Sequence, residues 1–333
     1  MKPTEYIPYL DVLRLIAILF IIAQHTSAMY LSTLGLCQGD AGYYVYSFFE
    51  NTPSVYLFIL ISGSLLLAPE REISYPVIFK KYCWRIIQVL LIFGLPMCFM
   101  EQYVAQDLTL SQKIVNSIIN LITGDCWTHM WYLYMLLGLY ILTPLFKVFI
   151  NHSSQKDLLY LIGALFVMSF GLDTLSYWFP EKFTSYIKYP IYLCLYPMGY
   201  YLHRYCNLTR SQIWIPIIGI LCSVAYLVIK GRLGWCVPYK QDIMDVVWVI
   251  SVFVFVKMLP INSLCWKTIG KCCFGIYLIH PVFLNVLFKV VHIEQYDWAL
   301  PCVKLFTIEL VIFLLCYGIV RLLRKCAYFA KIM

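Results

Sequence analysis

The chain has 333 residues, of which 62% are hydrophobic and 13% are charged, and its formal net charge is +8. Soluble domains carry about 25% charged residues, so the composition excludes a soluble globular protein and predicts a multi-pass membrane protein of the all-α class. Most basic residues lie between the apolar runs. Membrane topology therefore explains the positive charge better than nucleic-acid binding does.

The first apolar run, residues 9–30, is long enough to cross a bilayer but contains Asp11, Arg14 and His25. Ionisable groups inside hydrocarbon are costly unless they are paired or in contact with water. Arg14 and His25 are 11 residues apart, so in a helix they lie within about 20° of one face and about 16 Å apart in depth. This pattern predicts that the first helix lines a polar cavity within the membrane.

The later apolar runs predict about ten transmembrane helices in a single domain covering residues 1–333. With a cytoplasmic N-terminus, 16 of the 25 basic residues lie in inside segments and eight lie outside. This bias favours both termini in the cytoplasm. The expected spans are 9–30, 46–68, 84–104, 129–150, 158–177, 187–203, 213–230, 243–259, 269–290 and 302–323.

His25 is the first candidate catalytic residue. It is expected deep in the outer half of the first span, and histidine titrates near neutral pH, as a general base requires. The alternative is a structural hydrogen-bonding role. Asp11 and Arg14 are neighbours at i, i+3 and could form an ion pair at the helix end. Arg14 shares a face with His25, however, and a guanidinium can bind phosphate or polarise a carbonyl.

The basic stretch FKKYCWR, residues 79–85, is expected at the cytoplasmic face. Its Lys80, Lys81 and Arg85 could be topological signals only, or they could form a cationic entrance for a phosphorylated donor. Ser62 lies in a run of small residues, FILISGSLL, near that entrance. Such residues favour close helix packing, although they could also let a narrow ligand approach the backbone.

Three further ionisable residues in predicted spans are candidates for the acceptor side: His129, His280 and Glu309. Pro281 follows His280 and should free helix backbone groups, which membrane proteins tolerate near protein or water. Glu309 is expected to pair or to face a cavity. The 14 cysteines lie mostly in apolar runs, where free cysteine behaves as a small buried hydrophobe. The sequence therefore predicts no metal site and no disulfide framework.

Five motifs, in this order, resemble those of the acyltransferase family 3 membrane proteins over residues 5–325. They are LDVLRLIAILFIIAQH (10–25), VYLFILISGSLLL (55–67), FKKYCWRII (79–87), HMWYLYMLLGLYILTPLF (129–146) and IGKCCFGIYLIHP (269–281). The length resembles the enterobacterial-common-antigen O-acetyltransferase branch of that family.

The resemblance implies transfer of an acyl group, usually acetyl from acetyl-CoA, to a hydroxyl of an envelope glycan or lipid-linked sugar at the bacterial inner membrane. It implies no tightly bound cofactor, with acyl-CoA as co-substrate. The family's key arginine and histidine correspond to Arg14 and His25, and its third-helix arginine corresponds to Arg85. A second arginine common in the family is absent at the matching place, where Lys81 or Tyr82 stands.

Two other classes of function stay open. A glycan transporter or flippase would also place polar residues near the bilayer midplane, and a non-catalytic assembly subunit is the third interpretation. Even for an acyltransferase, His25 could act as a base or carry the acyl group transiently. The residues leave open the acceptor sugar, its hydroxyl position, and the choice between acetyl and succinyl.

Overall fold

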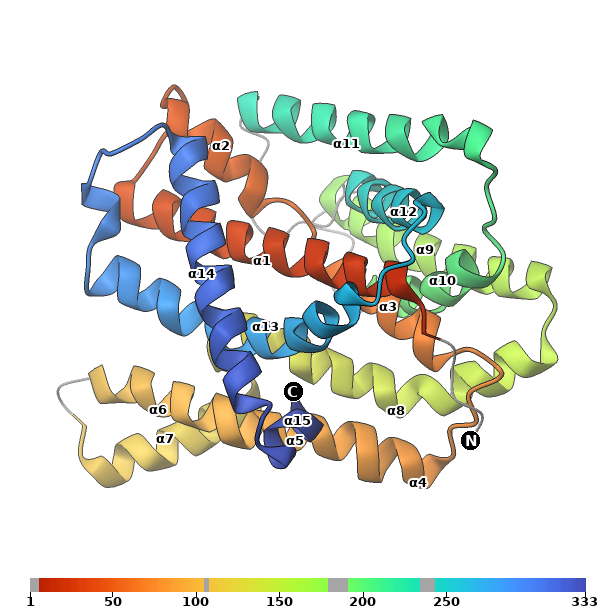
Figure 1. The fold of residues 1–333 in the computed structure, drawn as a ribbon, viewed down its shortest axis with the longest axis horizontal. Helices are drawn as coiled ribbons and strands as arrows, with labels where there is room; N and C mark the ends of the chain where they lie inside the picture. The colour runs from red at the N-terminus through yellow and green to blue at the C-terminus, as the bar shows by residue number, and fades with distance from the viewer. Residues whose placement is uncertain (1–5, 105–107, 179–190, 234–242) are drawn as a thin grey trace. The chain divides into compact units, whose positions relative to one another are not determined.

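A computed structural model describes residues 6–104, 108–178, 191–233 and 243–333 (Figure 1). Helices account for most of these residues, and no β-strand occurs among them. The predicted all-α class is confirmed. Helices are the expected solution for a chain this apolar, because a helix satisfies its backbone hydrogen bonds within one segment.

Backbone contacts divide the chain into two compact units. Unit 1 comprises residues 1–65, 155–325 and 333, and unit 2 comprises residues 66–154 and 326–332. That the two act as a single domain over residues 1–333 stays a prediction.

Unit 1 contains the first helix and most of the second half of the chain. Its helices are α1 (Pro8–Leu34), α2 (Ala41–Glu50), α3 (Val55–Leu66), α9 (Gln155–Trp178), α10 (Tyr192–Arg204), α11 (Trp214–Arg232), α12 (Ile243–Met258), α13 (Cys265–Lys289) and α14 (Pro301–Leu323). The short helices η4 (Arg210–Gln212) and η5 (Ile293–Gln295) precede α11 and α14.

Unit 2 begins with a continuous helical stretch from Tyr75 to Val104. It consists of α4 (Tyr75–Val77), η1 (Ile78–Cys83), α5 (Trp84–Val89), η2 (Leu90–Gly94) and α6 (Leu95–Val104). The wider turns of a π-helix form η1 and η2. The remaining helices are α7 (Leu110–Thr123), η3 (Thr128–Met130), α8 (Trp131–His152) and α15 (Ala327–Ile332).

Six helical segments among the described residues are long and apolar enough to cross a membrane. They are Pro8–Leu34, Tyr75–Tyr103, Leu110–His152, Arg210–Arg232, Cys265–Lys289 and Pro301–Leu323. The count of about ten spans and the cytoplasmic position of both termini stay predictions. The first part of the expected span 187–203 falls on residues 179–190, outside the described residues.

Two expected boundaries differ from the structure. The span expected at 46–68 is two helices, because α2 ends at Glu50 and α3 begins at Val55. Pro53 accounts for the break, since it lacks an amide hydrogen and disfavours helical backbone in the preceding residue. The helical segment that contains the third expected span, 84–104, begins already at Tyr75. Lys80 and Lys81 are therefore helical residues.

Helix α7 lies between the expected spans 84–104 and 129–150, in a segment for which the sequence predicts no membrane span. Thr109 and Gln112 form a reciprocal capping box at its start, and Gly124 ends it with a positive φ of 80°. Both are local signals that favour helix boundaries. The helix is nevertheless short, which explains why the apolar runs alone did not indicate it.

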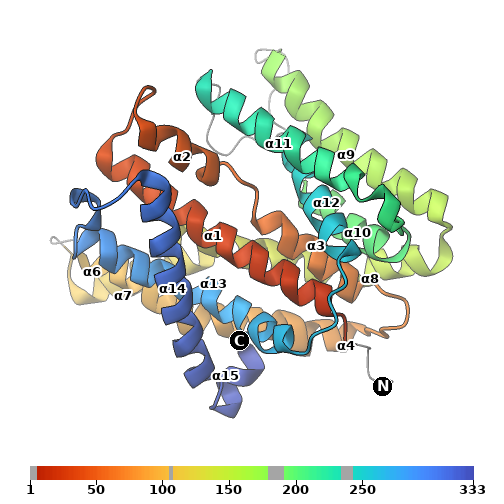
Figure 2. The same ribbon diagram turned by 45° about the horizontal axis from the view of Figure 1, so that its top comes forward.

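Helices α1 and α13 lie side by side and run in the same direction, with α14 packed against both (Figures 1 and 2). Three contacts along their length establish the direction. Asp11 lies against Gly270, the His25 and His280 rings are 5.2 Å apart, and the Tyr30 and Phe288 rings are 4.9 Å apart. The predicted topology also has these two helices run in the same direction, and the side of the membrane from which they start stays a prediction.

The carboxyl-terminal end of α10 meets the start of α1. The Tyr9 hydroxyl is 2.5 Å from His203 Nδ1. Lys257, at the end of α12, donates to the carbonyl oxygens of Leu202, His203 and Cys206 at 2.7–2.9 Å. A lysine in this position satisfies the last carbonyl groups of a helix. These contacts hold the start of α1 and the end of α12 against the carboxyl-terminal end of α10.

Candidate functional site

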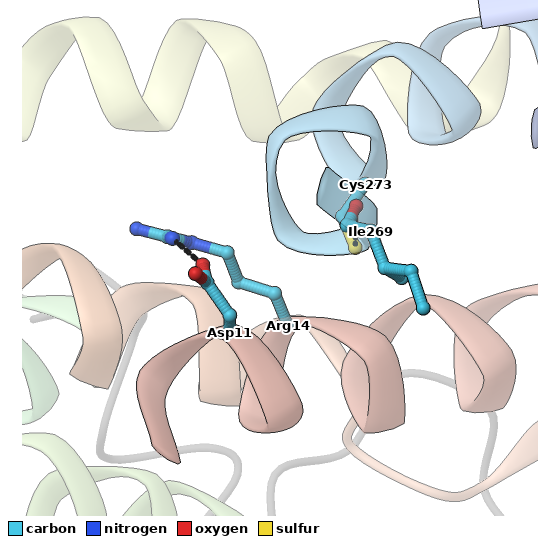
Figure 3. A network of polar contacts seen from close by, with 4 residues as sticks. All are labelled: Asp11, Arg14, Ile269 and Cys273. Atoms are coloured by element: carbon cyan, nitrogen blue, oxygen red, sulfur yellow. Dashed lines mark hydrogen bonds and ion pairs between the residues drawn. The ribbon is translucent and has the colours of Figure 1, made fainter. Parts of the chain in front are cut away.

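Helix α1 carries Asp11, Arg14 and His25 of the first predicted span without interruption. Asp11 is buried, and the Arg14 side chain is 28% exposed. The two form an ion pair one turn apart (Figure 3). The pair holds the guanidinium of Arg14 at the start of the helix, on the same face as His25.

Helix α13 approaches α1 closely beside this ion pair. Gly270 makes the approach feasible, because a Cβ at this position would overlap the Asp11 carboxylate. Figure 3 shows the next turn of α13, in which the Cys273 thiol donates to the Ile269 carbonyl oxygen at 3.3 Å. The charged pair of α1 therefore lies at the α1–α13 contact.

Further along the same contact, His25 and His280 lie next to each other. Their ring centroids are 5.2 Å apart and the rings are inclined by 54°. His280 is fully buried, whereas His25 is partly exposed. The structure thus brings together one main catalytic candidate and one acceptor-side candidate from opposite ends of the chain.

The tautomer of His280 follows from its backbone contact. Its Nδ1 is 2.8 Å from the carbonyl oxygen of Tyr277, and a carbonyl oxygen can only accept, so Nδ1 carries the hydrogen. Pro281 has no amide hydrogen to give to that same carbonyl, four residues before it. In a neutral ring, Nε2 of His280 then has the lone pair.

The other two acceptor-side candidates, Glu309 and His129, lie on different helices from this pair. Glu309 is buried on α14, the helix that packs against both α1 and α13. His129 belongs to unit 2, where it is buried in η3 directly before α8, with its ring 6.2 Å from the Trp127 ring. Unit 1 alone therefore provides His25, His280, Arg14 and Glu309.

The predicted donor-binding residues Lys80, Lys81 and Arg85 all lie in unit 2. Lys80 and Lys81 are exposed on η1. Arg85 is partly buried on α5, and its Nε donates to the carbonyl oxygen of Ile332 at 2.9 Å. Arg85 thus holds α15 against α5 with one of its five N–H donors.

Arg71 belongs to the same basic segment as Lys80, Lys81 and Arg85, but the sequence did not indicate its contact with Tyr82. Its guanidinium donates to the Tyr82 hydroxyl at 2.7 Å and lies 5.7 Å from the centre of that ring. Lys81 lies at the same distance from the Tyr82 ring, and Tyr140 packs edge-on against it at 5.5 Å. Arg71 precedes the helix by several residues, so the spacing of the helical motif gave no sign of this contact.

Ser62 belongs to a contact between α3 and α10 in unit 1. Gly63 and Gly199 let the two helices touch, because a Cβ at either position would overlap a backbone carbonyl of the other helix. Ser64 adds a hydrogen bond to the Gly199 carbonyl oxygen at 2.8 Å. Helix packing thus accounts for the two residues after Ser62, while Ser62 itself is partly exposed.

The described part of the chain contains no group of three or more histidine, cysteine or acidic residues able to hold a metal ion.

Comparison with known proteins adds one match. The sequence fits the model of the acyltransferase 3 family, which is described as an acyltransferase domain, over residues 7–325. The match covers nearly the whole chain and both structural units. No curated protein and no solved structure matches the chain.

Proposed function

The chain belongs to the acyltransferase 3 family, and on that premise we propose that this multi-pass membrane acyltransferase is an O-acetyltransferase. It takes acetyl from cytoplasmic acetyl-CoA and transfers it to a hydroxyl of an envelope glycan or lipid-linked sugar at a bacterial inner membrane. The enterobacterial-common-antigen branch is the part of the family whose length it resembles. The observation that carries the proposal is the His25–His280 pair beside the α1–α13 contact.

In the proposed reaction, His25 removes the proton from the acceptor hydroxyl, and the oxygen attacks the thioester carbonyl. The carbon–sulfur bond breaks, and the CoA thiolate takes the proton back from His25. General bases of this kind contribute about 10² to 10⁴-fold to rates. His280 supports the step, because its Nε2 lone pair can accept a hydrogen bond from the protonated ring of His25, much as the third group of a catalytic triad orients the base.

Arg14 is proposed to orient the acetyl donor. The ion pair with Asp11 engages part of the guanidinium, which has five N–H donors in a rigid fork. Its remaining donors can bind a carbonyl or phosphate oxygen of the donor at a point about 16 Å along the helix from His25. Glu309 is kept as a residue of the acceptor side on the strength of its burial beside α1 and α13, and His129 as one from unit 2.

Unit 2 is proposed to bind the nucleotide part of CoA. Lys80, Lys81 and Arg85 supply positive charge for its phosphates. Arg71 is a second guanidinium in the basic region, and it compensates for the arginine that the sequence motif lacks.

The proposal can be tested with radiolabelled acetyl-CoA and sealed vesicles that contain this protein as their only protein. The vesicles also contain envelope glycan from which mild alkali has removed the esters. We expect label to appear on the glycan as an alkali-labile ester. If glycan crosses the vesicle membrane without acquiring label, the chain is a transporter. His25→Gln at equal abundance is the matched control and should give no ester above background.

A further inference from the structure

Beyond the histidine pair, α1 leads into a cluster of aromatic and polar side chains. Tyr30 of α1 stacks on Tyr46 of α2, with ring centroids 4.5 Å apart and planes inclined by 4°. Phe288 of α13 meets Tyr30 edge-on at 4.9 Å. Tyr30 is five residues after His25, which corresponds to about 7.5 Å along the helix. The cluster therefore forms the next level of the same α1–α13 contact.

Three buried oxygen atoms in this region have no hydrogen-bond partner among the described residues. They are Ser27 Oγ, Tyr30 Oη and Glu294 Oε2. Ser27 and Tyr30 are one turn apart on α1, and both are fully buried. The Glu294 side chain is 8% exposed and belongs to η5, which packs against α1 and α13. Proteins seldom bury polar atoms without partners, so three in one place indicate a group that the chain itself does not supply.

The loop next to this cluster exposes aromatic and acidic side chains. Residues 290–300 join α13 to α14 and include η5. Tyr296 and Trp298 are exposed on it, at 58% and 45%. Asp297 is exposed and pairs with Lys304 at 2.6 Å, and the other oxygen of Glu294 lies 3.5 Å from His292. Exposed aromatic faces and carboxylate oxygens suit the apolar faces and hydroxyl groups of sugars.

We propose that Ser27, Tyr30 and Glu294, under the 290–300 loop, form the subsite for an uncharged sugar of the acceptor. This inference rests on the proposed function and specifies the side from which the acceptor reaches His25. Glu294 accepts hydrogen bonds from sugar hydroxyls, and the Ser27 and Tyr30 hydroxyls complete the contacts. A carboxylate at this position repels phosphorylated or acidic sugars, which is why the subsite favours a neutral residue.

Glu294→Gln and Tyr30→Phe test the subsite in the reconstituted full-length protein. The probe is alkali-treated envelope polysaccharide, separated by anion exchange into neutral and acidic fractions. We expect the apparent KM for the neutral fraction to rise at least fivefold in each variant, with the KM for acetyl-CoA unchanged. Glu294→Gln should also narrow the preference for the neutral over the acidic fraction.

Ser27→Ala and Ser32→Ala form the matched pair. Ser32 lies on the same helix, but its hydroxyl already donates to the Met29 carbonyl oxygen, so only Ser27→Ala should raise the acceptor KM. Unchanged acceptor KM values in Glu294→Gln and Tyr30→Phe would assign the buried oxygens to internal water and overturn the subsite. A wild-type protein that forms no ester at all would instead overturn the acyltransferase proposal.

Discussion

His280 donates its Nδ1 hydrogen to the carbonyl oxygen of Tyr277 at 2.8 Å. Pro281 cannot supply the amide hydrogen that this carbonyl would receive in an uninterrupted helix. The sequence His-Pro therefore holds the imidazole in one tautomer with its Nε2 as the basic nitrogen, next to the ring of His25.

A double substitution separates a backbone role of His280 from a chemical one. In His280→Ala/Pro281→Ala the new amide at position 281 satisfies the Tyr277 carbonyl, so the helix should be restored. If His280 supports catalysis, kcat should stay at least tenfold below wild type while thermal stability recovers. Full recovery of kcat in the double variant would reduce His280 to a partner of the backbone.

Substitution of His25 should abolish most turnover without affecting insertion. His25→Ala is expected to lower kcat by about 10² to 10⁴-fold, the usual loss for a general base. His25→Gln should not restore it, because an amide can hydrogen-bond but cannot accept the proton. Ester formation at equal membrane abundance is the measurement. Near-normal turnover in His25→Gln would mean that another residue is the base, with His280, Glu309 and His129 as the candidates.

If Arg14 contacts the donor, substitutions of Arg14 and of Asp11 should lower kcat/KM by different factors. Asp11→Asn keeps the guanidinium and a hydrogen-bonding partner, so a loss of less than tenfold in kcat/KM is expected. Arg14→Lys keeps the charge but loses the planar fork of donors, and a loss of 10-fold to 100-fold is expected. Equal losses in both variants, restored by Asp11→Asn/Arg14→Gln, would make the pair purely structural.

Substitution of Arg71 should change the apparent KM for acetyl-CoA and leave the KM for the acceptor unchanged. Arg71→Gln is expected to raise the apparent KM for acetyl-CoA at least fivefold, as is Arg85→Gln, because each removes a cation near the proposed phosphate position. Lys113→Gln is the control within unit 2, since Lys113 donates to the Tyr103 carbonyl oxygen on the predicted outer side. An unchanged KM in correctly inserted Arg71→Gln and Arg85→Gln would leave these charges as topological signals.

The predicted topology can be tested by thiol labelling in intact cells. In a background without reactive native cysteines, Gln295→Cys should react with a membrane-impermeant maleimide, and Lys156→Cys should react only after permeabilisation. Both positions are exposed on the structure, so access to solvent does not limit either reaction. Labelling of position 156 from outside would invert the orientation of unit 1, and with it the side from which the acceptor enters.

The sequence by itself determined the helical class and the alignment of Arg14 with His25. Both are local properties, because apolar segments must satisfy their backbone groups internally in lipid, and the helical period fixes which residues of one helix share a face. Local signals also existed for the break at Pro53 and for the capping box of α7, but they were outweighed by the long apolar runs around them.

Tertiary structure alone decided which distant residues meet. The contact of His25 with His280, the position of Arg71 against Tyr82, and the stacking of Tyr30 on Tyr46 each join separate helices or a helix and a loop. Hydrophobic periodicity carries no information about such pairs, because it marks the buried face of a helix without naming the helix that covers it. Close approach at Gly270 and the His-Pro geometry at His280 depend on that pairing, and so the candidate site became visible only in the folded chain.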